Sequence, residues 1–395
     1  MSHSTKYGMF KTERIIEGFT DEISVFPGET LHFKVRCLVP KFSISFARIE
    51  DQRTLLEVKN LKSNKQPIPT NPYLGVNWET SYILEIPLAW GSGLYVASLN
   101  AQNSKFFVFF VVKGFDNEIA VLAPNNTWQA YNFWGGGCFY DIHGAKQIPI
   151  LGVNRPVITS APQVITNLVR KNSAEIFHNN HILSCEQLLY RWMSKRYQYN
   201  VISDRDFGLL KNYKVLVIGC HAEYWSEDMY NQLEAFLSHG GKLIYLGGNA
   251  IFWKVLVQNN FIKCDKANHE TWRRSERDEA RVLGIHYTDT GYTTMGQYKV
   301  RNYKHWVFQD TKLANGDIFG KYASGWETDK TSDQTPEDTV LLAKGTNPNY
   351  SGADMVCRPN VFSVGSVTYT SCLNDPIISK ITENVVERFT STVVL

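Results

Sequence analysis

The middle of the chain alternates apolar runs with one amphipathic segment. Residues 215–218 are all apolar, a pattern typical of a strand that is buried on both faces. From Ser226 onward, apolar residues recur at helical spacing as far as a glycine pair at 240–241, which predicts a helix capped by Ser226. A second apolar run at 243–246 follows and leads through two glycines to Asn249. This order predicts a strand–helix–strand unit with two parallel strands.

Three polar residues that can carry chemistry follow these two strands. His221 and Glu223 come directly after the first strand, and Asn249 comes after the second. In open α/β sheets, ligands bind at the carboxyl ends of parallel strands, so the three side chains are expected at one edge of the sheet. This edge is the predicted active site.

The first part of the chain has a different pattern. Short runs of β-type residues, several of them alternating, are separated by turn signals such as Pro27-Gly28. They predict an immunoglobulin-like β-sandwich over residues 1–115, followed by an α/β domain over residues 116–395 that opens with the apolar run 119–123. Two domains also suit a length of 395 residues. The expected sandwich strands are 22–25, 30–37, 43–49, 82–86, 93–100 and 106–112.

The rest of the chain carries weaker signals. The segment 265–360 is rich in loops and poor in periodicity, so only short strand candidates can be placed in it. The further expected elements are helices at 160–172, 183–196 and about 375–388, and strands at 282–286, 339–343 and 361–364.

Charge and composition narrow the possible partners. The formal net charge is +3 without a polybasic tract, which argues against nucleic acid or an anionic membrane as the main partner. The sequence has no apolar stretch of about 20 residues and no signal-peptide core, so we expect a soluble, cytoplasmic protein. The seven cysteines are an odd number without a CxxC pair, which favours neither a disulfide framework nor a thiolate zinc site.

Four motifs occur in an order that points to a known family. They are TWQAYNFWGG (127–136), GCHAEYWSEDMYNQLEAFLSHGGKLIYLGGN (219–249), TWRRSE (271–276) and FSVGSV (362–367). Together they resemble the carboxy-terminal catalytic region of the large subunit of N,N-dimethylformamidase and its relatives. The resemblance covers most of residues 80–372, and it is most specific in the second motif.

The resemblance implies a fold and a reaction. The implied fold is a β-sandwich followed by a domain like class I glutamine amidotransferases, that is, a flavodoxin-like and mostly parallel sheet. The implied reaction is hydrolysis of the carbon–nitrogen bond of a small amide or formamide at a mononuclear Fe(III) held by two tyrosines and one glutamate. Relatives of this kind are oligomeric, so a homo-oligomer and a small partner subunit are also expected. The fold does not fix the substrate.

The resemblance assigns roles to the residues after the two strands. Glu223 matches the iron-binding glutamate, His221 the active-site histidine beside it, and Asn249 an active-site asparagine. Bound iron would act as a Lewis acid, and His221 could relay a proton to the departing amine. Asn249 could donate a hydrogen bond to the developing oxyanion.

The two tyrosine ligands are assigned less directly. Tyr131 is the first, because it follows the opening strand of the α/β domain. For the second, Tyr95 matches a family position by spacing, and Tyr140 competes with it. A phenol ligates as tyrosinate only beside a strong positive charge, and an all-oxygen ligand set selects a hard ion such as Fe(III). Near the C-terminus, Asn360 stands where the family enzyme has an acidic residue.

The sequence is also compatible with two alternatives to the iron hydrolase. Cys220 next to His221 suggests a cysteine hydrolase, but neighbouring residues of an extended segment point to opposite sides, and the sequence has no GxCxG elbow. The second alternative is a non-catalytic binding or interaction protein of the same fold, suggested by the missing acidic residue at Asn360.

Overall fold

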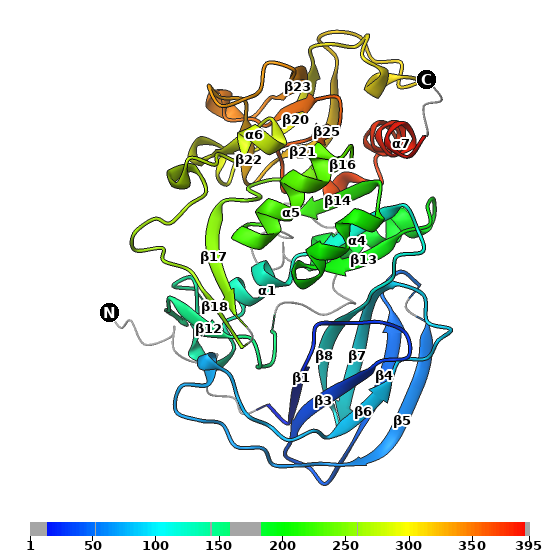
Figure 1. The fold of residues 1–395 in the computed structure, drawn as a ribbon, viewed down its shortest axis with the longest axis vertical. Coiled ribbons are helices and arrows are strands. Elements are labelled where there is room, and N and C mark those ends of the chain that lie inside the picture. The colour runs from blue at the N-terminus through cyan, green and yellow to red at the C-terminus, as the bar shows by residue number, and fades with distance from the viewer. Residues whose placement is uncertain (1–13, 52, 143, 159–182, 259, 392–395) are drawn as a thin grey trace.

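The structure of the protein is a computed structural model that describes residues 14–51, 53–142, 144–158, 183–258 and 260–391. In Figure 1, the sandwich of N-terminal strands lies at the bottom and the larger mixed α/β part lies above it. The helix predicted at 160–172 lies outside the described residues.

The N-terminal strands form two sheets that share one apolar core. Residues in this core alternate with more exposed ones along the strands, as in β4, where Phe42, Ile44 and Phe46 are buried and their neighbours are less so. All six strand segments expected here are strands, whereas β1 and β5 were not predicted. The first sheet has the order β1 (Ile16–Thr20), β3 (Thr30–Cys37), β6 (Tyr82–Glu85), and the second β2 (Ser24–Val25), β8 (Ser104–Val112), β7 (Gly93–Ala101), β4 (Lys41–Arg48), β5 (Thr54–Lys62).

A nine-stranded sheet is the centre of the larger part. Its first five strands are parallel, and the other four extend it in antiparallel pairs. The order is β13 (Asn200–Ser203), β9 (Ile119–Ala123), β14 (Val215–Cys220), β16 (Lys242–Gly247), β25 (Val361–Ser363), β24 (Asp354–Cys357), β23 (Val340–Gly345), β20 (Met295–Val300), β21 (Ile318–Gly325).

The predicted fold class is therefore wrong. A flavodoxin-like sheet is mostly parallel, but this sheet is mixed, and strand residues outnumber helical residues in the described chain. The difference arises in the segment 265–360, where the strand predicted at 339–343 is confirmed as β23, but β20, β21 and β24 have no counterpart among the predicted strands. The strand predicted at 282–286 is also wrong, because α6 (Ala280–Leu283) ends inside this range and a strand begins only at its last residue, His286. The predicted division at 115/116 falls between β8 and β9 and remains a prediction.

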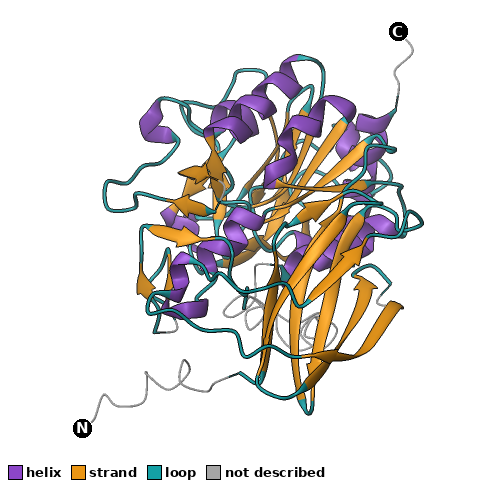
Figure 2. Cartoon of the chain, turned by 60° about the horizontal axis from the view of Figure 1, so that its bottom comes forward, coloured by secondary structure: helices purple, strands orange, loops and turns teal. Residues whose placement is uncertain are grey.

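Helices cover both faces of the nine-stranded sheet (Figure 1 and Figure 2). On β14, Val215 and Val217 belong to one apolar cluster, while Leu216 and Ile218 belong to another. This two-sided burial explains the uninterrupted apolar run in the sequence. The first cluster includes side chains of α4 (Ser184–Ser194) and α7 (Pro376–Thr390), and the second includes side chains of α5 (Glu227–Ser238) and the 3-10 helix η3 (Asp204–Asn212).

Three smaller sheets accompany the main one in the larger part of the described chain. The chain leaves β9 through the short helix α1 (Asn125–Tyr131) and leaves β14 through β15. The four-stranded sheet has the order β12 (Ile150–Gly152), β18 (Phe261–Lys263), β17 (Trp253–Gln258), β15 (Tyr224–Ser226), and the two-stranded sheets pair β10 (Gly137–Cys138) with β11 (Lys146–Gln147) and β19 (His286–Thr288) with β22 (Thr328–Lys330).

The parallel register brings the ends of β14 and β16 to the same edge of the sheet. Cys220 pairs with Gly247, so the residues after both strands start from one level. At Gly248 the chain passes very close to the turn between β21 and β22, because a Cβ atom there would lie 2.6 Å from the Glu327 carbonyl oxygen and 2.7 Å from the Val367 nitrogen. Only glycine fits this approach without movement of the neighbouring backbone.

We expect Gly248→Ala to lower the free energy of unfolding by about 1–3 kcal/mol, because the added methyl group must displace backbone atoms on both sides. Urea denaturation of the purified variant measures this change. Gly208→Ala is the matched control, since a Cβ atom at Gly208 meets nothing within 4 Å and should leave stability nearly unchanged. Equal stability of the two variants would contradict the close approach at Gly248.

Candidate active site

The backbone after β14 is fixed by contacts from two sides. The Thr127 hydroxyl oxygen of α1 accepts hydrogen bonds from the backbone N–H groups of Glu223 (3.0 Å) and Tyr224 (3.4 Å). On the other side, the Glu223 carbonyl accepts the N–H groups of Phe252 (3.1 Å) and Trp253 (3.0 Å). The Glu223 backbone is consequently held between α1 and the start of β17.

Three oxygen atoms lie in contact with one another and are called the oxygen triad below: the Tyr131 and Tyr140 hydroxyl oxygens and Glu223 Oε2. The Tyr131 and Tyr140 hydroxyl groups both donate to Glu223 Oε2, at 2.8 and 2.7 Å, and the two phenolic oxygens lie 2.8 Å apart. Tyr131 and Thr127 are four residues apart on α1, so one face of this helix contacts both the backbone and the carboxylate of Glu223. Tyr140 comes from the loop after β10.

His221 is fully buried beside this oxygen triad. Its Nε2 lies 3.2 Å from Glu223 Oε2 and 3.2 Å from the Tyr131 hydroxyl, and its Nδ1 lies 3.0 Å from the Gly248 carbonyl oxygen. Burial alone would lower the pKa of His221, but the Glu327 and Glu223 carboxylates raise it above its usual value. Burial alone would raise the pKa of Glu223, but His221 keeps it below its usual value. The pair therefore favours a protonated imidazole beside an ionised carboxylate.

Asn249 connects this pair to a second buried carboxylate. Its Nδ2 donates to Glu327 Oε2 at 2.8 Å, and the same oxygen lies 3.8 Å from His221 Nδ1. The backbone of Asn249 is left-handed, with φ +53°, and its N–H donates to Asp329 at 2.8 Å. The buried Asn249 Oδ1 has no hydrogen-bond partner among the residues that the structure describes.

Lys266 places a positive charge beside the triad. Its Nζ lies 3.3 Å from the centre of the Tyr140 ring, 4.7 Å from that of Trp253 and 5.4 Å from that of Tyr224. Such a position over aromatic faces is a cation–π arrangement. Burial lowers the pKa of Lys266, and the Glu223 carboxylate opposes this effect.

A known protein family matches most of the chain. Residues 48–384 match the family described as N,N-dimethylformamidase beta subunit-like, C-terminal. The chain belongs to this family. The resemblance seen in the sequence is thus confirmed, and the oxygen triad and His221 fall within the matched residues.

Individual relatives are more distant. The beta subunits of N,N-dimethylformamidase from Alcaligenes sp and from Paracoccus aminophilus are each 24% identical over 225 residues, which cover 47% of this chain and 29% of each relative. The chain therefore matches less than a third of the length of these dimethylformamidase subunits. A solved structure described as mmIFT52 N-terminal domain has a TM-score of 0.34, 13% identity, and coverage of 53% of this chain and 92% of its own, which is too low to carry an argument.

Tyr95, a candidate for the second tyrosine ligand, lies away from Tyr131, Tyr140 and Glu223 in the structure. Tyr95 lies in β7, where its ring stacks on Trp90 at a centroid distance of 4.9 Å and its hydroxyl donates to the Gly91 carbonyl at 2.8 Å. It belongs to the core of the sandwich and is not part of the oxygen triad. Of the two candidates for the second tyrosine, the structure brings Tyr140, and not Tyr95, to Glu223.

Asn360 also lies away from the triad. It precedes β25, so it is at the amino end of a strand, whereas His221 and Asn249 follow the carboxyl ends of β14 and β16. Its amide donates to the carbonyls of Leu237 (3.3 Å) and Gly241 (3.4 Å) at that opposite edge. The acidic group near Asn249 is instead Glu327, which lies in the segment where sequence periodicity gave no signal.

The geometry does not favour a nucleophilic Cys220. Its backbone is left-handed, with φ +56°, but its side chain is fully buried in a small apolar cluster that includes Cys185 and Val367. Burial raises the pKa of the Cys220 thiol well above its usual value. A reactive cysteine requires a lowered pKa and access to substrate.

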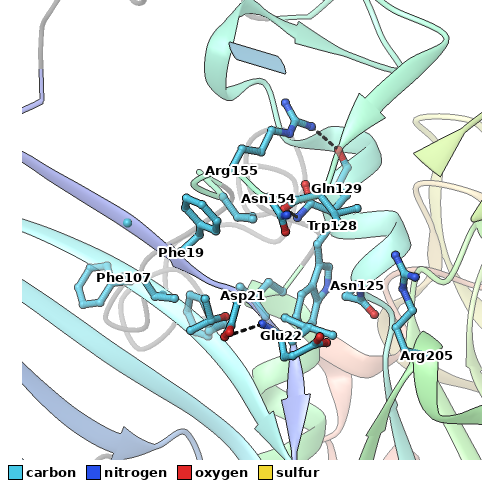
Figure 3. A pocket seen from close by; sticks show the side chains of 18 of the residues that line it. Phe19, Asp21, Glu22, Phe107, Asn125, Trp128, Gln129, Asn154, Arg155 and Arg205 are labelled. Carbon is cyan, nitrogen blue, oxygen red and sulfur yellow. Dashed lines mark hydrogen bonds between the residues drawn. The ribbon is translucent and has the colours of Figure 1, made fainter. Parts of the chain in front are cut away.

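A cavity of about 580 Å³ lies on the other face of α1 (Figure 3). Asn125, Trp128 and Gln129 line it, whereas Thr127 and Tyr131 of the same helix face Glu223. Phe19, Asp21 and Phe107 are among the residues of the sandwich that form its opposite wall. The cavity lining includes no residue of the oxygen triad, so α1 separates the two sites.

No helix in the described part of the chain has the length and apolar character needed to cross a membrane.

We expect Thr127→Val to lower the free energy of unfolding by about 1–3 kcal/mol, because two buried N–H groups lose their acceptor while the side-chain shape is kept. Thermal unfolding measures the loss. Thr127→Ser retains the hydroxyl group and should be closer to the unmodified protein than Thr127→Val is. A Thr127→Val protein as stable as Thr127→Ser would show that this hydroxyl does not hold the Glu223 backbone.

Proposed function

We propose that the chain hydrolyses the carbon–nitrogen bond of a small amide or formamide, using a mononuclear Fe(III) held by Tyr131, Tyr140 and Glu223. The observation that carries the proposal is the convergence of the two phenolic oxygens and Glu223 Oε2 within 2.7–2.8 Å of one another. Membership in the dimethylformamidase-like family supports the reaction class.

The three oxygens suit a small hard cation. Two phenols and one carboxylate form an all-oxygen donor set, which would favour a hard ion such as Fe(III). Burial, followed by the Glu223 carboxylate, raises the pKa of both phenols well above the usual value. Deprotonation therefore requires additional positive charge, which a trivalent ion provides. When bound, Fe(III) would act as a Lewis acid toward an amide carbonyl or a water molecule.

The neighbouring side chains are suited to moving protons. Because His221 Nδ1 faces the Gly248 carbonyl, its Nε2 is directed toward Glu223 and Tyr131, where it can deliver a proton to a departing amine. Burial raises the pKa of Glu327, whereas His221 opposes this effect. A buried carboxyl group with a raised pKa is suited to general acid–base work.

Asn249 and Glu327 would also orient the substrate. The Asn249 Oδ1 atom, which has no hydrogen-bond partner among the described residues, suits a water molecule or an amide N–H, and the Asn249 Nδ2 atom is held by Glu327. Asn360, on which the non-catalytic alternative depends, lies at the opposite edge of the sheet and contacts Leu237 and Gly241, so the proposal gives it no part in the reaction. Because both relatives are named beta subunits, we extend the proposal to association with a partner subunit or with further copies of the chain.

We expect the purified chain, grown or refolded with iron, to contain close to one iron per chain and to show a visible tyrosinate-to-iron band. Tyr131→Phe, Tyr140→Phe and Glu223→Gln should each lose both signals, because each removes one ionisable oxygen ligand of the triad. Elemental analysis and a visible spectrum provide the measurement.

Tyr95→Phe is the matched control for these variants and should keep iron and the band, because Tyr95 lies in the sandwich core. Loss of iron in Tyr95→Phe together with its retention in Tyr140→Phe would contradict the ligand assignment. A chain that takes up no iron at all would contradict the metal proposal.

We expect Glu327→Gln to reduce kcat by about 10²–10⁴-fold while iron content is unchanged, because the carboxyl group would transfer protons and not bind the metal. Activity is measured on the best substrate from a panel of small amides that includes N,N-dimethylformamide. Asn360→Asp is the control, and it should leave kcat unchanged because Asn360 lies at the opposite edge of the sheet. Full activity of Glu327→Gln would exclude this role.

A further inference from the structure

Tyr140 receives a hydrogen bond from a third buried tyrosine. The Tyr224 hydroxyl donates to the Tyr140 hydroxyl at 2.6 Å, and the Tyr140 oxygen lies 2.7 Å from Glu223 Oε2 and 2.8 Å from the Tyr131 hydroxyl oxygen. Tyr224 directly follows Glu223 in the sequence, but the side chain approaches the triad from the outside, through Tyr140. The contact is therefore with a proposed ligand atom and not with the carboxylate.

The position of Tyr224 is fixed by its surroundings. Only 1% of its surface is exposed, and its ring meets Tyr131 and Tyr140 edge to face at centroid distances of 6.4 Å each. Its backbone is held in β15, which pairs with β17, and its N–H donates to Thr127. The hydroxyl group thus has a set place relative to the Tyr140 oxygen.

Metal binding would fix the direction of the hydrogen bond between Tyr224 and Tyr140, with Tyr224 as the donor. A phenolate oxygen is only an acceptor, so a ligating Tyr140 could no longer donate to its neighbours, whereas Tyr224 could still donate to it. Tyr140 also has the Lys266 ammonium over its ring, while the Tyr131 hydroxyl lies beside His221 Nε2. The two tyrosines consequently have different polar neighbours.

We propose that Tyr224 is a positioning residue that donates a hydrogen bond to the Tyr140 ligand oxygen and makes the two tyrosine ligands electronically inequivalent. The inference rests on the proposed iron site. Hydrogen bonds to ligand atoms orient the ligand and tune the metal. Donation by Tyr224 stabilises the electrons of the Tyr140 oxygen, so removal of the donor lowers the energy needed to transfer charge from this oxygen to Fe(III).

The test compares the visible spectrum and the rate of iron release to a chelator in the unmodified protein and in Tyr224→Phe. The variant keeps the ring and its packing and loses only the hydroxyl group. We expect the charge-transfer band to move to longer wavelength and iron to leave about tenfold faster. A purely structural role would not shift the band.

A second variant tests the same hydrogen bond independently, and it can be used if Tyr224→Phe does not fold. Incorporation of 3-fluorotyrosine at position 224 keeps the shape and strengthens the donor, so the band should move to shorter wavelength. Tyr230→Phe is the control and should change neither signal, because this buried tyrosine stacks on Trp272 and its hydroxyl has no hydrogen-bond partner within the described residues.

The outcomes separate this inference from the proposed function. If the unmodified protein has no iron band, the iron site itself is wrong, and the inference is wrong with it. If the unmodified protein has the band but neither variant shifts it, the iron site stands and the role of Tyr224 is overturned. A shift in opposite directions in the two variants supports the inference.

Discussion

Burial of the Glu223 carboxylate is the constraint on which the rest of the site depends. A buried charge is stable only when it is paired and hydrogen-bonded, and one oxygen of Glu223 has Tyr131, Tyr140 and His221 within 3.2 Å. These partners come from a helix after β9, a loop after β10 and the segment after β14. The elements must therefore hold their positions together, and the Thr127 contact to the Glu223 backbone joins α1 to the end of β14.

Local signals explain which elements were predictable. The strand–helix–strand unit at 215–246 appears as β14, α5 and β16, because two apolar runs, the Ser226 cap and the glycine pair are all local features. The antiparallel half of the sheet lacks such signals. Its pairing is interrupted by register shifts between Gly296 and Tyr298 and between Leu341 and Ala343, and a bulge breaks the period of two that marks a strand. The prediction of a mostly parallel sheet followed from the regular strands alone, because only these have a clear sequence pattern.

Local signals likewise distinguish the candidate site residues that could be predicted from those that could not. His221, Glu223 and Asn249 follow parallel strands, so the strand-end rule finds them. Tyr95 could have been excluded by counting along its strand, because alternate residues of a strand share a face and Tyr95 belongs to the sandwich core with Ala97 and Leu99. Glu327 and Lys266 have no comparable signal, since both lie in irregular segments that only the folded chain brings to the site.

The antiparallel extension completes the site. A sheet made only of the parallel strands would offer the groups that follow β9, β14 and β16, and these include one acidic side chain in the cluster, Glu223. The turn between β21 and β22 adds Glu327, and it reaches Asn249 because Gly248 leaves no side chain in its path. The hydrogen bond between Asn249 and Glu327 thus joins the parallel and antiparallel halves at the point where proton transfer is proposed. The part of the chain that departs from the expected fold is therefore the part that gives His221 a second carboxylate neighbour.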